Sequence, residues 1–120
     1  KAVRAVALKL DLSQTSTFED FAQQVKKNLE DVWQRNTFDY LINNGGTGGP
    51  MMFADMTEDY FDKMLNTNFK GPFFLTQQMV KLMEDGGRIV NTSSASSSTA
   101  LFATSWATRP TRSRSRSGAR

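Results

Sequence analysis

The 120-residue chain contains no cysteine and no histidine. Without cysteine it has neither a disulfide framework nor a cysteine-based zinc site, and without histidine it lacks an imidazole base and the commonest metal ligand. A Ser-His-Asp hydrolase is therefore excluded. The chemistry of this sequence must use hydroxyls, amides, carboxylates or a cofactor.

Long apolar runs are also missing. No uninterrupted apolar stretch approaches the roughly 20 residues that span a bilayer, and the opening Lys-Ala-Val-Arg lacks the apolar region of a secretory signal. We therefore expect a cytoplasmic location and no membrane partner. The length allows one small α/β domain, which suggests a piece of something larger.

The net charge of +3 comes from the end of the chain. Residues 109–120 hold five arginines and no acidic residue, and the other ten basic residues are outnumbered by 12 acidic ones. A nucleic-acid interface needs basic residues spread over a folded surface, so nucleic acid is not an expected partner. We expect a folded domain over residues 1–98 and a disordered Ser/Thr/Arg-rich tail over residues 99–120.

Strand-like and helix-like patterns alternate along the first 98 residues. A capping box formed by Ser16 and Glu19 predicts the start of the first helix, and Glu58 and Asp59 suit the first turn of the second. The order βαβαβ is typical of a parallel sheet with right-handed crossovers. The expected elements are a strand over residues 3–10, a helix to Trp33, a strand over 38–43, a helix over 57–83 ended by residues 85–87, and a strand over 88–92.

Asn68 lies on the apolar face of the second helix, where an unpaired amide would cost about 1–3 kcal/mol. Pro72 has no N–H for the Asn68 carbonyl, so we expect a kink that leaves this carbonyl for water or a ligand, and Gly71 should loosen the same turn. A buried asparagine satisfied by neighbouring backbone, with an incidental kink, is the alternative.

Two further segments are candidates for a site. Ser93 and Ser94 follow the last strand at the carboxyl end, where open α/β sheets bind ligands, although a solvated turn is the ordinary reading of such serines. The glycine cluster over residues 45–49 is neither a Walker loop nor a Gly-x-Gly-x-x-Gly fingerprint. By itself it is weak evidence for a phosphate site.

Four motifs in order resemble the short-chain dehydrogenase/reductase family. They are Asp-Leu-Ser at residues 11–13, Asn-Asn-Gly-Gly at 43–46, Asn-Thr-Asn-Phe-Lys-Gly-Pro-Phe at 66–73 and Gly-Arg-Ile-Val-Asn-Thr-Ser-Ser at 87–94. The resemblance implies a partial Rossmann-type, doubly wound parallel sheet. It further implies NAD or NADP as cofactor, hydride transfer to or from a carbonyl or alcohol substrate, and homo-oligomers among intact relatives.

The same resemblance assigns roles to particular residues. Asn68 corresponds to the catalytic asparagine whose main-chain carbonyl holds a proton-relay water, and Ser94 to the serine that holds the substrate oxygen. The cofactor-binding positions implied by the family are Asp11 and Leu12 at the adenine, Asn44, Gly45 and Gly46 along the ribose, and Thr92 beside the nicotinamide.

The sequence also departs from the family. The family's glycine-rich pyrophosphate turn would precede the part of the fold represented here. Ala107 and Thr111 occupy the positions of the tyrosine and lysine of the family's Tyr-x-x-x-Lys motif. We therefore expect a chain truncated at both ends, inactive on its own, with a tail from a shifted reading frame. The alternative is a noncatalytic nucleotide- or nucleic-acid-associated protein that uses an Arg-Ser tail.

Overall fold

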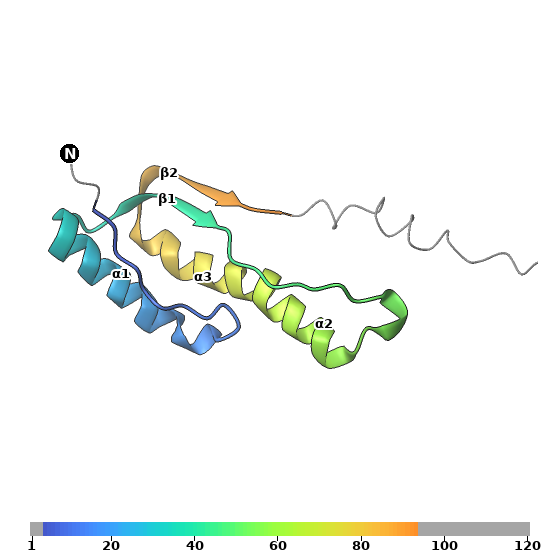
Figure 1. Ribbon diagram of the computed structural model, residues 1–120. Helices are drawn as coiled ribbons and strands as arrows, with labels where there is room; N and C mark the ends of the chain where they lie inside the picture. The colour runs from blue at the N-terminus through green and yellow to red at the C-terminus, as the bar shows by residue number, and fades with distance from the viewer. Residues whose placement is uncertain (1–3, 94–120) are drawn as a thin grey trace, which may run out of the picture.

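The computed structural model describes residues 4–93, and Ser94 and the tail over residues 99–120 lie outside this range. Figure 1 shows two parallel strands with helices on one face of the sheet. The elements are α1 (Phe18–Trp33), β1 (Phe38–Asn43), α2 (Glu58–Leu65), α3 (Gly71–Met79) and β2 (Met83–Asn91), with a π-helical turn over Asn66–Lys70 and short 3-10 turns at Thr15–Thr17, Phe53–Asp55 and Val80–Leu82. This helix-strand-helix-strand order confirms the expected α/β class.

The expected first strand does not form within the described residues. Residues 4–10 run as an extended segment beside α1, without a ladder partner (Figure 1). A strand exists only when a neighbour exchanges backbone hydrogen bonds with it, and β1 pairs with β2 alone. The predicted strand over residues 3–10 is therefore wrong for the described residues, because its pairing partner is not among them.

Strand β2 begins earlier than the strand expected over residues 88–92. Asp85-Gly86-Gly87 was expected to end the preceding helix, but β2 starts at Met83 and these residues lie inside it. Phe38 pairs with Met83 and Tyr40 with Arg88, so the intervening β2 residues bulge out of the ladder, and Gly86 adopts a φ of 80° there. From Arg88 onward the register is regular and ends with Asn43 opposite Asn91.

Helix α1 has the apolar face expected from its sequence but not the expected cap. Its N-cap is Thr17 rather than Ser16, and no side chain caps it. The chain enters through the 3-10 turn, in which the Phe18 N–H bonds to the Thr15 carbonyl, so this turn replaces the capping box. At the other end Gln34 adopts a left-handed conformation with a φ of 54°.

The second predicted helix is a composite. The helix starts where Glu58 and Asp59 predicted, and Thr57 caps it by accepting a hydrogen bond from the Tyr60 N–H at 3.2 Å. The π-helical turn then joins α2 to α3, and Pro72 stands in the first turn of α3, where it offers no N–H to the carbonyl of Asn68 one turn earlier. The irregularity expected from Pro72 is therefore a π turn, a feature frequent at functional sites.

The core lies between α1 and α3. Its buried members are Phe18, Ala22, Leu75 and Met79. The opposite sheet face carries Tyr40, Ile42 and Val90, all more than half exposed, and nothing among residues 4–93 covers it. Parallel sheets are normally covered on both faces, so the described part presents one half of a layered fold.

Candidate cofactor and active site

Asn68 holds the loop after β1 against the helix. Its Oδ1 accepts a hydrogen bond from the Thr47 N–H at 2.7 Å, and its Nδ2 donates to the Thr47 carbonyl at 2.7 Å. The side-chain amide thus pairs with a backbone unit as a neighbouring strand would. Asn68 is exposed rather than buried, so its placement is explained by this clamp and not by burial.

The backbone at Asn68 is set by Pro72. The carbonyl of Asn68 cannot accept the usual α-helical bond from residue 72, because proline has no N–H. Just before this point the Gly71 N–H bonds to the Asn66 carbonyl, five residues back, in the π-helical pattern. The side chain of Asn68 is therefore engaged by Thr47, and its carbonyl lacks the bond that residue 72 would normally donate.

A second polar cluster joins the carboxyl ends of both strands to α3. Nδ2 of Asn43 donates to Oγ1 of Thr76 at 3.0 Å and to Oδ1 of Asn91 at 2.8 Å. The ladder continues beyond it, since the Thr92 N–H bonds to the Asn43 carbonyl at 2.9 Å. These contacts fix the sheet edge that holds the predicted cofactor residues relative to the helix that holds Asn68.

Leu12 brings the extended segment against both α3 and the glycine loop. A Cβ on Gly71 would lie 2.1 Å from the Leu12 carbonyl oxygen, and one on Gly45 would lie 2.7 Å from Leu12 Cδ1. Gly71 was expected only to loosen its turn, but the structure shows that it permits this close approach. The glycine at position 45 likewise leaves room for the Leu12 side chain.

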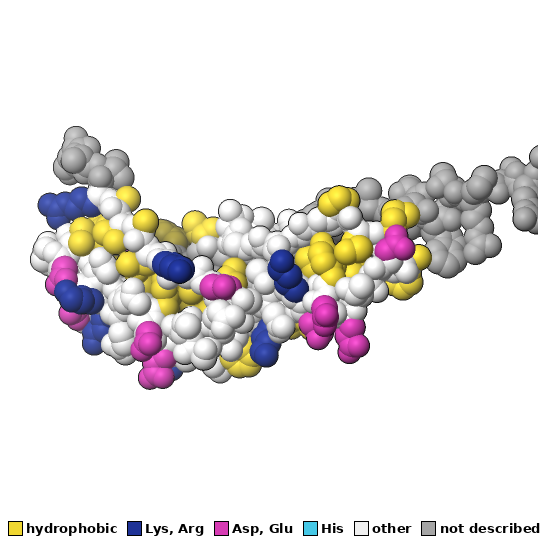
Figure 2. Space-filling model, turned by 60° about the horizontal axis from the view of Figure 1, so that its bottom comes forward, with side chains coloured by type: hydrophobic (Ala, Val, Ile, Leu, Met, Phe, Trp, Pro, Cys, Tyr) yellow, Lys and Arg dark blue, Asp and Glu magenta, His cyan; other side chains and the backbone are white. Residues whose placement is uncertain are grey.

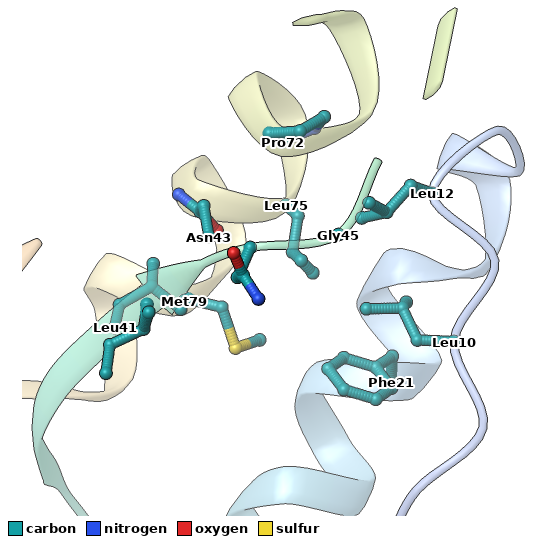
Figure 3. Close-up of a pocket in the computed structure, with 11 residues that line it drawn as sticks. Leu10, Leu12, Phe21, Leu41, Asn43, Gly45, Pro72, Leu75 and Met79 are labelled. Carbon is teal, nitrogen blue, oxygen red and sulfur yellow. The ribbon is translucent and has the colours of Figure 1, made fainter. Parts of the chain in front are cut away.

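A pocket of about 300 Å³ lies beside these contacts (Figure 3). Figure 3 shows Leu10 and Leu12 facing the end of β1 across it, with α3 behind. Asn44 and Gly45 also line it, so three of the predicted cofactor residues share one apolar cavity of a size typical of ligand sites. No lysine or arginine lines this pocket.

Asp11 is the first residue of the turn that follows the extended segment. Its Oδ1 accepts hydrogen bonds from the Ser13 hydroxyl at 2.7 Å and the Ser13 N–H at 2.9 Å. These bonds hold the pKa of Asp11 below its ordinary value, the hydroxyl contributing more than the N–H. Asp11 therefore presents a carboxylate acceptor at neutral pH.

The other predicted positions fall around this centre. Gly46 lies against the clamp, because a Cβ there would be 3.3 Å from Asn68 Oδ1. Thr92 follows directly on the strand end, whereas Ser94 lies outside the described residues. Sequence reasoning missed Thr47, Thr76 and Asn91, although a threonine on an apolar helix face and two asparagines ending neighbouring strands were readable signals.

Other kinds of site find no support in the described range. Within residues 4–93 no group of three acidic, cysteine or histidine side chains could hold a metal ion. No helix in the same range is long and apolar enough to cross a membrane.

Known proteins match this chain over most of its length. The family model for short chain dehydrogenase matches residues 1–106. Sepiapterin reductase of Chlorobaculum tepidum is 40% identical over 70 residues, covering 58% of this chain and 29% of its own length. NAD-dependent glycerol dehydrogenase of Listeria innocua is 31% identical over 100 residues, covering 82% and 37%.

Solved structures agree with the sequence relatives. The angucycline C-6 ketoreductase LanV with bound NADP is 32% identical with a TM-score of 0.70, over 76% of this chain and 35% of that one. A short chain dehydrogenase from Burkholderia cenocepacia in complex with NADP is 27% identical with a TM-score of 0.66, over 77% and 35%. The chain spans about a third of the length of these relatives. On the family match, the matching motifs and the shared Rossmann-like fold, the chain belongs to the short-chain dehydrogenase family.

Proposed function

We propose that this chain is part of an NAD(P)-dependent oxidoreductase, and that its described residues form the adenosine side of the cofactor site. The observation that carries the proposal is the meeting of Leu12, Asn44 and Gly45 at one pocket. Asp11 adds a carboxylate acceptor at the same turn. An apolar cavity with few polar groups suits a purine and its ribose.

The fit is limited to that half of a dinucleotide. A pyrophosphate is normally held by a helix N-terminus or by cationic side chains. No lysine or arginine lines the pocket, and the glycine-rich turn of the family is not among the 120 residues. We therefore propose that the pocket binds adenosine nucleotides and that the pyrophosphate and nicotinamide parts of a dinucleotide add no affinity. The proposed cofactor of the whole protein is NAD or NADP.

The remaining roles concern the reacting end. In the proposed reaction the cofactor exchanges a hydride with a carbonyl or alcohol carbon, and a proton moves to or from the substrate oxygen. We propose that the Asn68 carbonyl holds a water in the proton path and that the Asn68 side chain fixes this carbonyl by its clamp on Thr47. Ser94 would hold the substrate oxygen, and the backbone at Thr92 would lie beside the nicotinamide.

We propose that the 120-residue polypeptide by itself does not catalyse this reaction. Hydride transfer needs a proton donor matched to the working pH, and neither Ser94 nor Asn68 replaces a tyrosine activated by lysine. A panel of alcohols and ketones with NAD and NADP should give no change in nicotinamide absorbance. Turnover that disappears in Ser94→Ala would contradict this part of the proposal.

Calorimetric titration tests the binding part. Adenosine 5′-monophosphate should bind weakly, NADP should bind no more tightly, and Gly45→Val should weaken both because its side chain enters the space beside Leu12. Gly48→Val is the matched control, since a Cβ there has only an ordinary contact with Met64 at 3.8 Å. Binding that Gly45→Val leaves intact would contradict the assignment of the pocket.

The proposal extends to partners and location in coarser terms. A small carbonyl or alcohol compound is the proposed substrate class, and a homo-oligomer in a reducing, cytoplasmic compartment is the proposed state of the whole protein. The Arg-Ser alternative rests on residues 109–120, outside the described residues, and no contact in residues 4–93 favours it.

A further inference from the structure

The glycine loop after β1, residues 45–50, lies along one face of α2 and the π-helical turn. Figure 1 shows the chain leaving β1 and running beside these helical segments toward the far end of α2. Side chains spaced four residues apart form that face, and they meet the loop in reverse order. The contacts pair Asn68 with Thr47, Met64 with Gly48 and Tyr60 with Gly49.

Tyr60 makes the contact at the far end of the loop. Its hydroxyl donates a long hydrogen bond to the Gly49 carbonyl at 3.5 Å, and a Cβ on Gly49 would lie 3.2 Å from the hydroxyl oxygen. The backbone of Tyr60 is itself fixed, because its N–H donates to Oγ1 of Thr57 at the start of α2. Tyr60 therefore presents its hydroxyl to the loop from an anchored position.

Met64 supports the Asn68 clamp from one turn earlier. Its sulfur accepts a weak hydrogen bond from Nδ2 of Asn68 at 3.8 Å, and the same Nδ2 donates to the Thr47 carbonyl. Its Cε would lie 3.8 Å from a Cβ on Gly48, an ordinary van der Waals distance. Met64 thus fills the space beside the loop and restricts the rotation of the Asn68 amide.

The backbone of the glycine loop has no other hydrogen-bond partner within residues 4–93. Its hydrogen bonds in that range come from the side chains of Asn68 and Tyr60. Four of the six loop residues are glycines, which lose more conformational freedom on ordering than other residues, and Pro50 has no N–H. The helix face must therefore supply the contacts that order the loop.

We propose that Tyr60 and Met64 are positioning residues of the nucleotide site, which act with Asn68 by holding the glycine loop on the helix face. Neither Tyr60 nor Met64 lines the pocket, so both act through the loop backbone. The link to a nucleotide rests on the proposed function, whereas the holding of the loop rests on the contacts alone.

The loop carries this effect into the pocket because Asn44 and Gly45 lie between two anchors. The end of β1 fixes the chain before them, and the two bonds between Thr47 and Asn68 fix it after them. Without the second anchor, Gly45 would leave its close contact with Leu12 in part of the population. The apparent affinity for a nucleotide falls in proportion to the fraction of molecules that retain the pocket.

Amide hydrogen exchange in the full chain tests the holding of the loop. The Thr47 N–H is the reporter, because it donates to Oδ1 of Asn68. Tyr60→Leu and Met64→Ala should each raise its exchange rate several-fold. The matched controls, Phe61→Leu and Leu65→Ala, change the next residue along α2 at side chains that are 53% and 46% exposed, and they should leave the rate unchanged.

The amide of Ala22, buried in α1, separates this effect from a general loss of stability. Its exchange rate should stay at the parent value in Tyr60→Leu and Met64→Ala. If Met64→Ala loses its helical circular dichroism, Met64→Leu keeps the side-chain volume, removes the sulfur acceptor and should still accelerate exchange at Thr47. An unchanged Thr47 rate, an equal acceleration at Ala22, or control variants with the same effect would overturn the proposal.

Calorimetric titration with adenosine 5′-monophosphate tests the link to the nucleotide. The affinity should fall several-fold in Tyr60→Leu and Met64→Ala and stay at the parent value in Phe61→Leu and Leu65→Ala. Faster exchange at Thr47 with an unchanged affinity would overturn the positioning role. A parent chain that binds no adenosine 5′-monophosphate would contradict the proposed function and with it this role, while the exchange rates would still decide whether the helix face holds the loop.

Discussion

The two sides of α3 differ in how far their apolar side chains are buried. The side toward α1 buries Gly71, Leu75 and Met79, whereas the other side leaves Phe69 and Phe73 in solvent. Figure 2 shows apolar side chains between charged ones on the face of the molecule that it presents. Residues 4–93 therefore complete only one side of this helix, and predictions about the two sides should differ in size.

The largest expected effect is on the inner side of α3. Leu75→Ala removes a side chain that is 5% exposed, and buried leucines of this kind cost about 2–5 kcal/mol when truncated. Phe61→Ala, on exposed α2 surface, should stay within roughly 0.5 kcal/mol. Urea unfolding followed by circular dichroism measures both free energies, and comparable losses would remove the contrast.

Gly71 should tolerate a methyl group poorly. Gly71→Ala puts a Cβ against the Leu12 carbonyl at 2.1 Å, and overpacking of this kind costs about 1–3 kcal/mol. Gly48→Ala has room and serves as the control. Should both variants melt at the same temperature, the close approach of Leu12 to α3 would be wrong.

Loss of the Thr76 hydroxyl should have a smaller effect. Thr76→Val removes the acceptor of the Asn43 amide, a change of about 1 kcal/mol, while Thr76→Ser keeps the hydroxyl. Thermal unfolding of both variants gives the difference, and the Asn43 side-chain amide resonance should move in the valine variant alone. An unmoved resonance would show that the contact to α3 is not made.

The smallest expected effect concerns the pH dependence of folding stability. The folded-state pKa of Asp11 is lowered by Ser13, so its contribution is present above the ordinary pKa of 3.8 and is lost as the pH falls through the lower folded value. Asp11→Asn should therefore flatten the loss of stability below about pH 3.8. Asp20→Asn is the control, because Asp20 makes no side-chain hydrogen bond within residues 4–93, and equal flattening would discount the Ser13 bonds.

Local signals predicted most of the helices and the strand ends. The apolar spacing of α1 and the start of α2 near Thr57 were readable from the sequence because each depends on neighbours along the chain. The capping box at Ser16 failed because the chain enters α1 through a 3-10 turn with backbone bonds instead, and the strand over residues 3–10 failed because pairing depends on a partner.

Candidate site residues could be named from the sequence, but their contacts could not. The motif residues could be named, yet the pairing of the Asn68 amide with Thr47 and the contact of Gly71 with Leu12 join segments that are distant in sequence. Such contacts depend on how the segments pack. Polar residues in unexpected places, such as Thr76 on an apolar helix face, were the available clue.

Residue-resolved titration of the isotope-labelled chain with adenosine 5′-monophosphate tests most directly the claim that the inner side of α3 completes a cofactor wall. The amide resonances of Leu12, Asn44 and Gly45 should shift together and saturate, while those of Phe73 and Ile89 on the outer side stay in place. Shifts centred on the outer side, or no saturable shift at the three pocket residues, would contradict the assignment.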